Sequence, residues 1–192
     1  MTLDEIIRMI AMKYPHSYDV ERIIVMVNNA QQRIFRTMYK PKTAKVYDLL
    51  AGNPFYPIDF PSENIIDVVV NGKEYPHQNI KYTAQPYYYY ITDEKSLGIY
   101  PTPTEDVIQG LMVFHYKEPN VLSQVTDVPE LDPVWHTMLV YEVCKELALI
   151  DRDERAGLFV SELNELKRQF YASRPSRPHQ TLDVYGVGRG AL

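Results

Sequence analysis

The sequence predicts a mainly α-helical fold with a β insertion. It comprises a four-helix core, a small antiparallel β domain between helices two and three, and an extended C-terminal tail. Three observations lead to this prediction. Apolar residues recur every three or four positions near both ends of the chain, which is typical of amphipathic helices. Runs of β-branched and aromatic residues, bounded by turn residues, fill the middle and indicate strands. The last twenty residues follow neither pattern.

These patterns divide the 192 residues into three parts. We expect a helical core over residues 1–42 and 120–172, a β-rich insertion over residues 43–119, and a partner-binding tail over residues 173–192. Hydrophobic residues make up 45% of the sequence, which is enough to form a core. The length suits one domain with an insertion better than two independent domains.

The first helix is defined by its cap and its stop. Thr2 and Glu5 have the spacing of a capping box, in which each side chain binds the other's backbone. Tyr14 precedes Pro15, and a residue before proline avoids the helical conformation. We therefore expect a helix that starts after Thr2 and ends near Tyr14.

The second helix begins near Ser17 or Asp19 and ends before Pro41. Its apolar residues keep the helical period, while its other positions are crowded with amides. The helix therefore has a markedly polar face, and a polar face on a long helix suits contact with another subunit. The candidate subunit-interface residues on it are Asn28, Gln31 and Gln32.

The middle of the chain contains two predicted hairpins and a further strand. Residues 65–70 lead into Asn71-Gly72, a pair that favours a type I′ turn because both positions tolerate positive φ. Residues 87–92 and 97–100 flank a polar turn and form the second hairpin. Residues 110–117 alternate enough for a strand, with Leu111, Val113 and His115 as candidates for one face.

Four consecutive tyrosines, residues 87–90, stand at the start of the second hairpin. They could form a stacking platform for bases or sugars. In a strand, however, alternate side chains face opposite sides, so two would pack inward and two would meet solvent or another subunit. No arginine or lysine flanks the run, which favours packing. Tyr88 and Tyr90 are thus candidate interface residues.

Two further helices follow the β-rich middle. Asp132 and Pro133 suit the N-cap and the first position of the third helix. Asp151, with Glu154 three residues later, suits the N-cap of the fourth. We expect a buried stripe on the third helix formed by Trp135, Leu139, Val143 and Leu147, and a matching one on the fourth formed by Ala156, Phe159, Leu163, Leu166 and Phe170.

The sequence offers no catalytic or metal-binding motif. A single cysteine, Cys144, excludes an intrachain disulfide, and its apolar helical surroundings predict a buried, inert thiol. The histidines stand singly and never at the paired spacing of a zinc-binding helix: His16, His77, His115, His136 and His179. We therefore expect no catalytic residue, no metal and no cofactor.

Charge and hydropathy narrow the class of partner. The net charge of −5 argues against a protein that neutralises many phosphates of a nucleic acid. No stretch is apolar enough for a membrane span, and the N-terminus lacks the pattern of a signal peptide.

Prolines and glycines stop the C-terminal tail, residues 173–192, from folding alone, yet apolar residues are spaced through it. It therefore suggests a segment ordered on a partner, the alternative being a frayed terminus.

In this arrangement the chain resembles the head-tail connector proteins of tailed bacteriophages, also called adaptor or head-completion proteins. The likeness covers most of the chain. It rests on the polar-faced helix over residues 19–40, on residues 87–101 (YYYYITDEKSLGIYP), on residues 127–170, and on the tail from Ser173. Within residues 127–170, DVPELDP opens one helix and DRDERAG opens the next.

The resemblance implies a structural virion protein that forms a ring, usually of twelve copies, beneath the portal ring at the capsid vertex. Such a ring extends the channel through which DNA passes without specific binding during packaging and ejection. It also carries the next neck or tail component. The subunit would be made in the host cytoplasm, and no membrane is involved. The tail would bind the portal through Arg174, Arg177, Leu182, Val184, Tyr185, Val187 and Arg189.

Two other functions remain open from the residues alone. One is a small soluble enzyme, a hydrolase or nuclease with its site in the β insertion. The other is a regulatory binding domain that acts through its C-terminal tail. An enzyme requires a pocket with clustered ionisable groups, whereas a connector requires surfaces for its neighbours.

Overall fold

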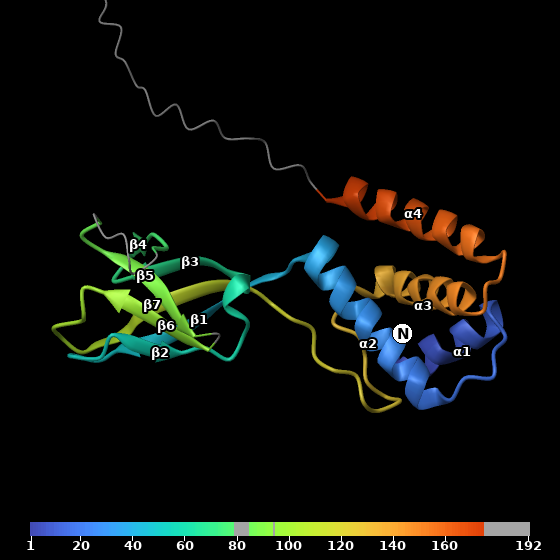
Figure 1. The fold of residues 1–192 in the computed structure, drawn as a ribbon, viewed down its shortest axis with the longest axis horizontal. Helices are drawn as coiled ribbons and strands as arrows, with labels where there is room; N and C mark the ends of the chain where they lie inside the picture. The colour runs from blue at the N-terminus through green and yellow to red at the C-terminus, as the bar shows by residue number, and fades with distance from the viewer. Residues whose placement is uncertain (79–84, 94, 175–192) are drawn as a thin grey trace, which may run out of the picture.

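The protein is described here by a computed structural model that covers residues 1–78, 85–93 and 95–174. Two bodies lie along its long axis (Figure 1). We call them the helical body, residues 1–39 and 120–174, and the β body, residues 42–116. The three-part domain division expected from the sequence stays a prediction, and the tail from residue 175 onward lies outside the described residues.

The expectation of a mainly α-helical fold is wrong. Within the described residues, four α-helices stand beside seven strands in two antiparallel sheets, so the fold mixes α and β structure. The sequence pattern led to an underestimate of the β body because two of its strands, residues 42–49 and 55–57, carry little strand signal. A third, residues 107–116, is longer than expected.

Capping explains where the first two helices begin. The helices are α1 (Leu3–Lys13), α2 (Val20–Ile34), α3 (His136–Ile150) and α4 (Ala156–Ser173). The capping box at Thr2 and Glu5 is present, and Asp19 accepts a hydrogen bond from the Arg22 N–H, as the sequence predicts. Beyond Ile34, α2 continues as a π-helical turn, η1 (Phe35–Tyr39), which was not expected.

The starts of α3 and α4 differ from expectation. Asp132 does cap, but it opens a 3₁₀ turn, η3 (Pro133–Trp135), before α3 proper. Asp151 does not cap α4, which begins five residues later. Its carboxylate instead accepts hydrogen bonds from the hydroxyls of Tyr14 (2.7 Å) and Tyr18 (2.6 Å). It thereby ties the α3–α4 turn to the segment between α1 and α2.

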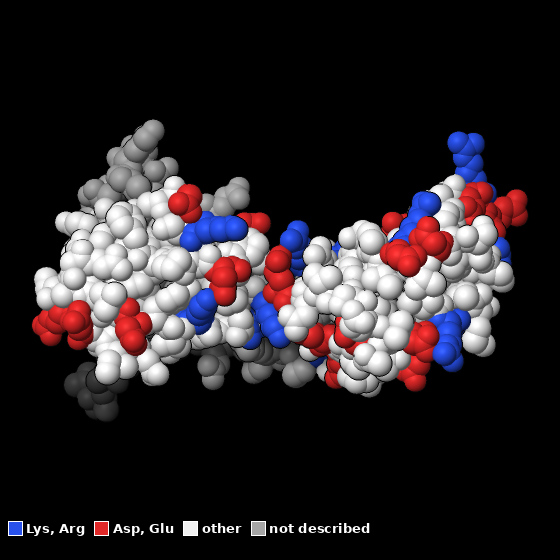
Figure 2. Space-filling view, turned by 90° about the horizontal axis from the view of Figure 1, so that it is seen from below, with Lys and Arg blue, Asp and Glu red and all other residues white. Residues whose placement is uncertain are grey.

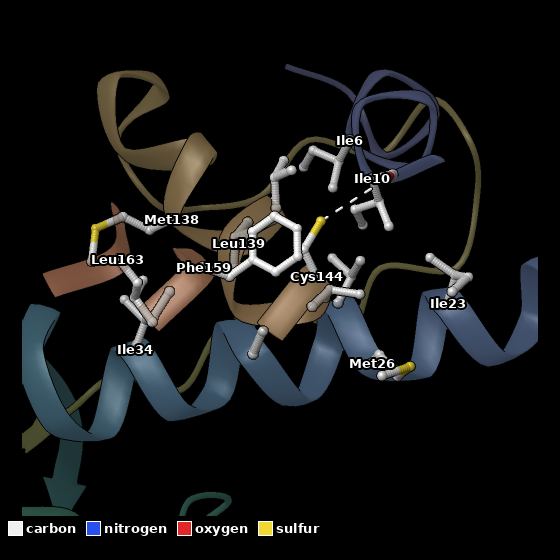
Figure 3. Packing of buried hydrophobic residues seen from close by; sticks show 14 of the residues in the cluster. Ile6, Ile10, Ile23, Met26, Ile34, Met138, Leu139, Cys144, Phe159 and Leu163 are labelled. Carbon is white, nitrogen blue, oxygen red and sulfur yellow. Dashed lines mark hydrogen bonds between the residues drawn. The ribbon is translucent and has the colours of Figure 1, made fainter. Parts of the chain in front are cut away.

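The core of the helical body forms around α3, which contacts all three other helices. Figure 3 shows side chains from α1, α2 and α4 converging on it, among them Ile10, Ile34 and Phe159. Leu139, Val143 and Leu147 are buried as predicted. Trp135 is only half-buried, because it lies in η3 at the edge of the core, with its ring edge-on to Phe170.

The β body consists of two sheets. Its strands are β1 (Lys42–Leu49), β2 (Phe55–Pro57), β3 (Ile65–Val70), β4 (Lys73–Tyr75), β5 (Tyr88–Asp93), β6 (Ser96–Tyr100) and β7 (Val107–Tyr116). One sheet has the order β1-β7-β3-β4 and the other β2-β6-β5. A short 3₁₀ turn, η2 (Ser62–Asn64), precedes β3.

Both predicted hairpins are confirmed. β3 and β4 join at Asn71-Gly72, whose φ angles of 49° and 77° place both residues in the left-handed region. β5 and β6 form the second hairpin. On β7, Leu111, Val113 and His115 are buried on one face, as the alternation predicts. The first two join a second core cluster, which contains no residue of the helices.

Candidate interaction surfaces

Aromatic side chains gather on one face of the sheet β2-β6-β5. Tyr88 and Tyr90 lie on β5, and strand register places Tyr88 opposite Tyr100 of β6. The rings of these two residues stack with centroids 5.0 Å apart. Tyr90 meets Phe55 of β2 edge-on, with centroids 6.4 Å apart. We call these four residues the aromatic face.

Gly98 makes the aromatic face possible. It lies on β6 between its register partners Phe55 and Tyr90. A Cβ atom at this position would stand 2.4 Å from the Tyr90 ring, closer than any real contact. The ring therefore covers the glycine and reaches across β6 towards Phe55. Sequence reasoning missed Phe55, Gly98 and Tyr100, because only the register of three strands brings them together.

The aromatic face is partly accessible to solvent. Phe55 and Tyr100 are each 48% exposed, whereas Tyr88 is 6% exposed beneath Tyr100. Burial raises the pKa of Tyr90, and nearby Tyr88 adds to the increase. Phenol groups that are half desolvated and half accessible are enriched at protein interfaces. This geometry suits a protein contact in which Phe55 and Tyr100 supply most of the free apolar surface.

Alternation along β5 separates the tyrosines, as the sequence predicts. Tyr89 belongs to the core of the β body, opposite in direction to Tyr88 and Tyr90. Its pKa is raised first by burial and then by the charge of Asp67. Tyr87 lies against Tyr75, with ring centroids 5.2 Å apart, and Lys73 stands over it. The run is thus divided among three environments and forms no continuous stacking platform.

Part of the polar face of α2 forms hydrogen bonds within its own chain. Asn28 binds the backbone of Leu122, and Gln31 donates to the carbonyl of Asn120 (2.9 Å). Gln31 is only 1% exposed and so offers almost no surface to another subunit. Gln32 is exposed. The subunit-interface role predicted for these residues stays a prediction, and Gln32 is the one placed to serve it.

Arg174 is the one predicted portal-binding residue that the structure describes. Its guanidinium donates to the carbonyls of Met38 (3.1 Å) and Tyr39 (2.6 Å) and lies 4.4 Å from the ring centroid of Phe170. These contacts fix the point where the chain leaves α4, at the end of η1. The other predicted portal-binding residues lie outside the described residues: Arg177, Leu182, Val184, Tyr185, Val187 and Arg189.

A buried carboxylate joins three helices, and sequence reasoning missed it. Glu142 of α3 is 2% exposed and is surrounded by Arg33 of α2 (3.1 Å), Lys167 of α4 (3.3 Å) and Lys145. Burial alone would raise the pKa of Glu142, but these three cations outweigh it and lower the pKa. Lys167 thus holds α4 against α3.

The described residues bring together no catalytic constellation. Within them, no three His, Cys, Asp or Glu side chains form a group that could hold a metal ion. His136 is fully buried and bonds the Leu131 carbonyl at 2.7 Å, as expected of a structural histidine. Burial raises the pKa of Cys144 to about 11, so at neutral pH its thiol is protonated and inert.

Two core clusters, a partly exposed aromatic sheet face and side chains committed to packing are features typical of a structural protein. The sequence matches the SU10 adaptor protein family over residues 1–182. The chain therefore belongs to this family and is a structural adaptor component of a phage virion. That membership implies a non-enzymatic role. No curated protein matches the chain. Among the described helices, none has the length and apolar character needed to cross a membrane.

Proposed function

We propose that the protein is the subunit of a closed ring of twelve copies that joins the capsid portal to the neck or tail. The ring extends the DNA channel, and each subunit contacts two neighbours and the portal. Family membership and the resemblance to head-tail connectors support the ring and the portal. The observation that carries the subunit contact is the aromatic face, in which Phe55 and Tyr100 are each about half exposed.

A closed ring needs two different surfaces on each subunit, one for each neighbour. The aromatic face of the β body supplies one of them. The second lies on the exposed side of α2, where Gln32 and Val25 reach solvent, Val25 being 57% exposed. The tail over residues 173–192 is the segment that binds the portal, and the contacts of Arg174 fix its root to η1.

The charge of the chain supports a channel that lets DNA slide. The net charge is −5, and Figure 2 shows acidic and basic side chains interspersed on the face that it draws. A lumen without a continuous basic surface does not hold phosphates. A strongly basic lumen in an assembled ring would contradict this part of the proposal.

Electron microscopy of the protein mixed with portal-bearing capsids tests the ring. We expect twelvefold density beneath the portal with the full chain. A chain that ends at Arg174 keeps the anchor of α4 and should remain folded, but it should lose stable docking. Unchanged docking of that truncated chain would overturn the portal role of the tail.

The aromatic face is tested by Phe55→Asp and Tyr100→Asp, since a charge in an apolar contact resists burial. The matched control is Tyr171→Asp on α4, where the side chain is 56% exposed. We expect the first two variants to remain folded monomers in the presence of portal-bearing capsids, while the control still assembles. Assembly of all three variants would exclude the aromatic face from the ring contact.

A further inference from the structure

The two bodies are connected by two short segments, which we call the linkers: residues 40–41 and 117–119. The linkers lie side by side, because the Lys117 N–H donates to the Pro41 carbonyl at 2.8 Å. Lys42 and Tyr116 then form the first residue pair of β1 and β7. Both crossings of the chain thus occur at one place, the narrow waist between helices and strands in Figure 1.

Among the described residues, neither body contributes a side chain to the buried core of the other. The buried cluster of the helical body contains no strand residue, and that of the β body contains no helix residue. Throughout residues 1–78, 85–93 and 95–174, no side-chain hydrogen bond or salt bridge joins a helix directly to a strand. Bodies without a large apolar interface are expected to move relative to each other.

What holds the waist is a set of polar contacts. Arg36 of η1 pairs with Glu118 of the second linker at 2.7 Å, and Lys117 pairs with Glu130 at 2.6 Å. All four side chains are partly exposed, the Arg36 side chain to 59%. Such ion pairs are weak and are screened by salt. They can open without exposing any of the two apolar cores.

The waist also has room for movement. A cavity of about 280 Å³ separates η1 from η2 and the end of β7. Its lining is largely charged or polar, which lets water enter and leave as its shape changes. The lining residues are Phe35, Arg36, Lys40, Glu63, Asn64, Tyr116, Lys117 and Glu118.

At the waist, the chain changes direction within a few residues. The π-helical turn η1 ends α2, and Lys40 follows with φ of 41°, a left-handed conformation that is uncommon for a residue with a side chain. Pro41 and Pro119 restrict φ on either side. Hinges are formed by a few such element-terminal residues that absorb the rotation.

We propose that the β body swings as a unit about the paired linkers, and that the Arg36–Glu118 and Lys117–Glu130 pairs latch the orientation described here. The latch is electrostatic, so ionic strength controls it. This inference does not rest on the proposed ring, because the movement belongs to the single chain. In a ring, it would let the β body adjust to a neighbour while the helical body stays in place.

Pulsed electron paramagnetic resonance tests the hinge on the full chain in solution. Spin labels are attached at Ile108→Cys in the β body, where the native side chain is 84% exposed, and at Glu162→Cys on the exposed side of α4. The native Cys144 is fully buried and does not take up label, which a labelling control on the native chain verifies. The distance distribution is recorded at low and at high salt.

We expect Arg36→Ala or Lys117→Ala to raise the population outside the native distance peak by about 1.4- to 5-fold, as loss of one exposed ion pair allows. About 1 M salt should do the same to the native chain without any substitution. The matched control, Arg168→Ala, removes the exposed Arg168–Glu165 pair on α4 and should change nothing. A distribution that stays the same in both latch variants and at high salt would overturn the hinge, as would an equal change in the control.

Discussion

Asn28 and Leu122 form a reciprocal hydrogen-bonded pair. The Asn28 side chain accepts from the Leu122 N–H at 2.8 Å and donates to the Leu122 carbonyl at 2.9 Å. The Asn28 side chain thus satisfies both backbone polar groups of Leu122, as a neighbouring strand would, although Leu122 lies in an irregular segment. Leu122 can therefore bury its own side chain in the core of the helical body, 3% exposed. The segment that returns from the β body is fixed to α2 at this point.

The first prediction concerns this pair. Asn28→Ala leaves the Leu122 N–H and carbonyl without partners, so we expect a loss of about 1–3 kcal/mol in the free energy of unfolding. Urea denaturation followed by circular dichroism measures it. Asn29→Ala, one position further and exposed, should stay within about 0.5 kcal/mol of the native chain. Equal losses in the two variants would contradict the role given to Asn28.

The second prediction concerns pH and Glu142. Its pKa is lowered below the ordinary value of 4.5, so the folded state binds a proton less readily than the unfolded state. The carboxylate therefore stabilises the fold above pH 4.5, and this contribution is lost as the pH falls from 4.5 through the folded pKa. Glu142→Gln should cost up to about 3–5 kcal/mol at pH 7, the range for breaking a buried pair, and progressively less in acid.

Urea unfolding of the native chain and of Glu142→Gln between pH 7 and pH 3 measures this difference. Glu146→Gln is the control, because Glu146 is one third exposed and meets Arg33 at 3.4 Å. It should cost less than about 1 kcal/mol. If the difference in the free energy of unfolding between the native chain and Glu142→Gln stays constant over this pH range, the charge of Glu142 does not stabilise the fold.

The third prediction separates Trp135 from Phe170, whose rings meet edge-on with centroids 5.3 Å apart. Phe170 is 2% exposed, so Phe170→Ala should cost about 3–5 kcal/mol. Trp135 is half-buried in η3, and Trp135→Ala should cost about 1–2 kcal/mol, from partial burial and the lost aromatic pair. Denaturant melts that rank the two in the reverse order would contradict this placement.

The fourth prediction uses two glycines of opposite environment. Gly98→Ala forces the Tyr90 ring away from β6 and should cost about 1–3 kcal/mol. Gly157→Ala, where an added Cβ meets nothing within 4 Å on α4, should instead stabilise the protein by about 0.5–1 kcal/mol. Combining Gly98→Ala with Tyr90→Ala should cost less than the sum of the single changes, because the ring that clashes is gone. Strict additivity in thermal melts would exclude the clash.

Elements with a local signal were predictable from the sequence. The capping box at Thr2 needs only Glu5 three residues later, and the type I′ turn needs only Asn71 followed by Gly72. Strand β1 has no such signal. Its exposed positions include Ala44 and Val46, while Lys45 between them is half-buried, so the usual alternation is reversed over these three residues. Pairing with β7, not its own pattern, makes this segment a strand.

The candidate sites show the same division between local and distant signals. The alternation of the tyrosines gave Tyr88 and Tyr90 one direction in advance, but Phe55 and Tyr100 join them only through strand register. No local pattern marks Glu142, and only the packing of α2 and α4 against α3 makes it a buried charged residue with cationic partners. Asp151 has the spacing of an N-cap for α4, yet its carboxylate accepts hydrogen bonds from two tyrosine hydroxyls instead of from the backbone of the helix.

The pairing of Lys42 with Tyr116 has a consequence for how such chains diversify. Partners in an antiparallel pair have Cα atoms about 4.5–5.5 Å apart, a gap that a tight turn can close. The chain thus departs from and rejoins the helical scaffold at almost the same point. We therefore expect the segment between these two residues to be exchangeable. A shorter, longer or different insert could replace it while the four helices keep their connectivity.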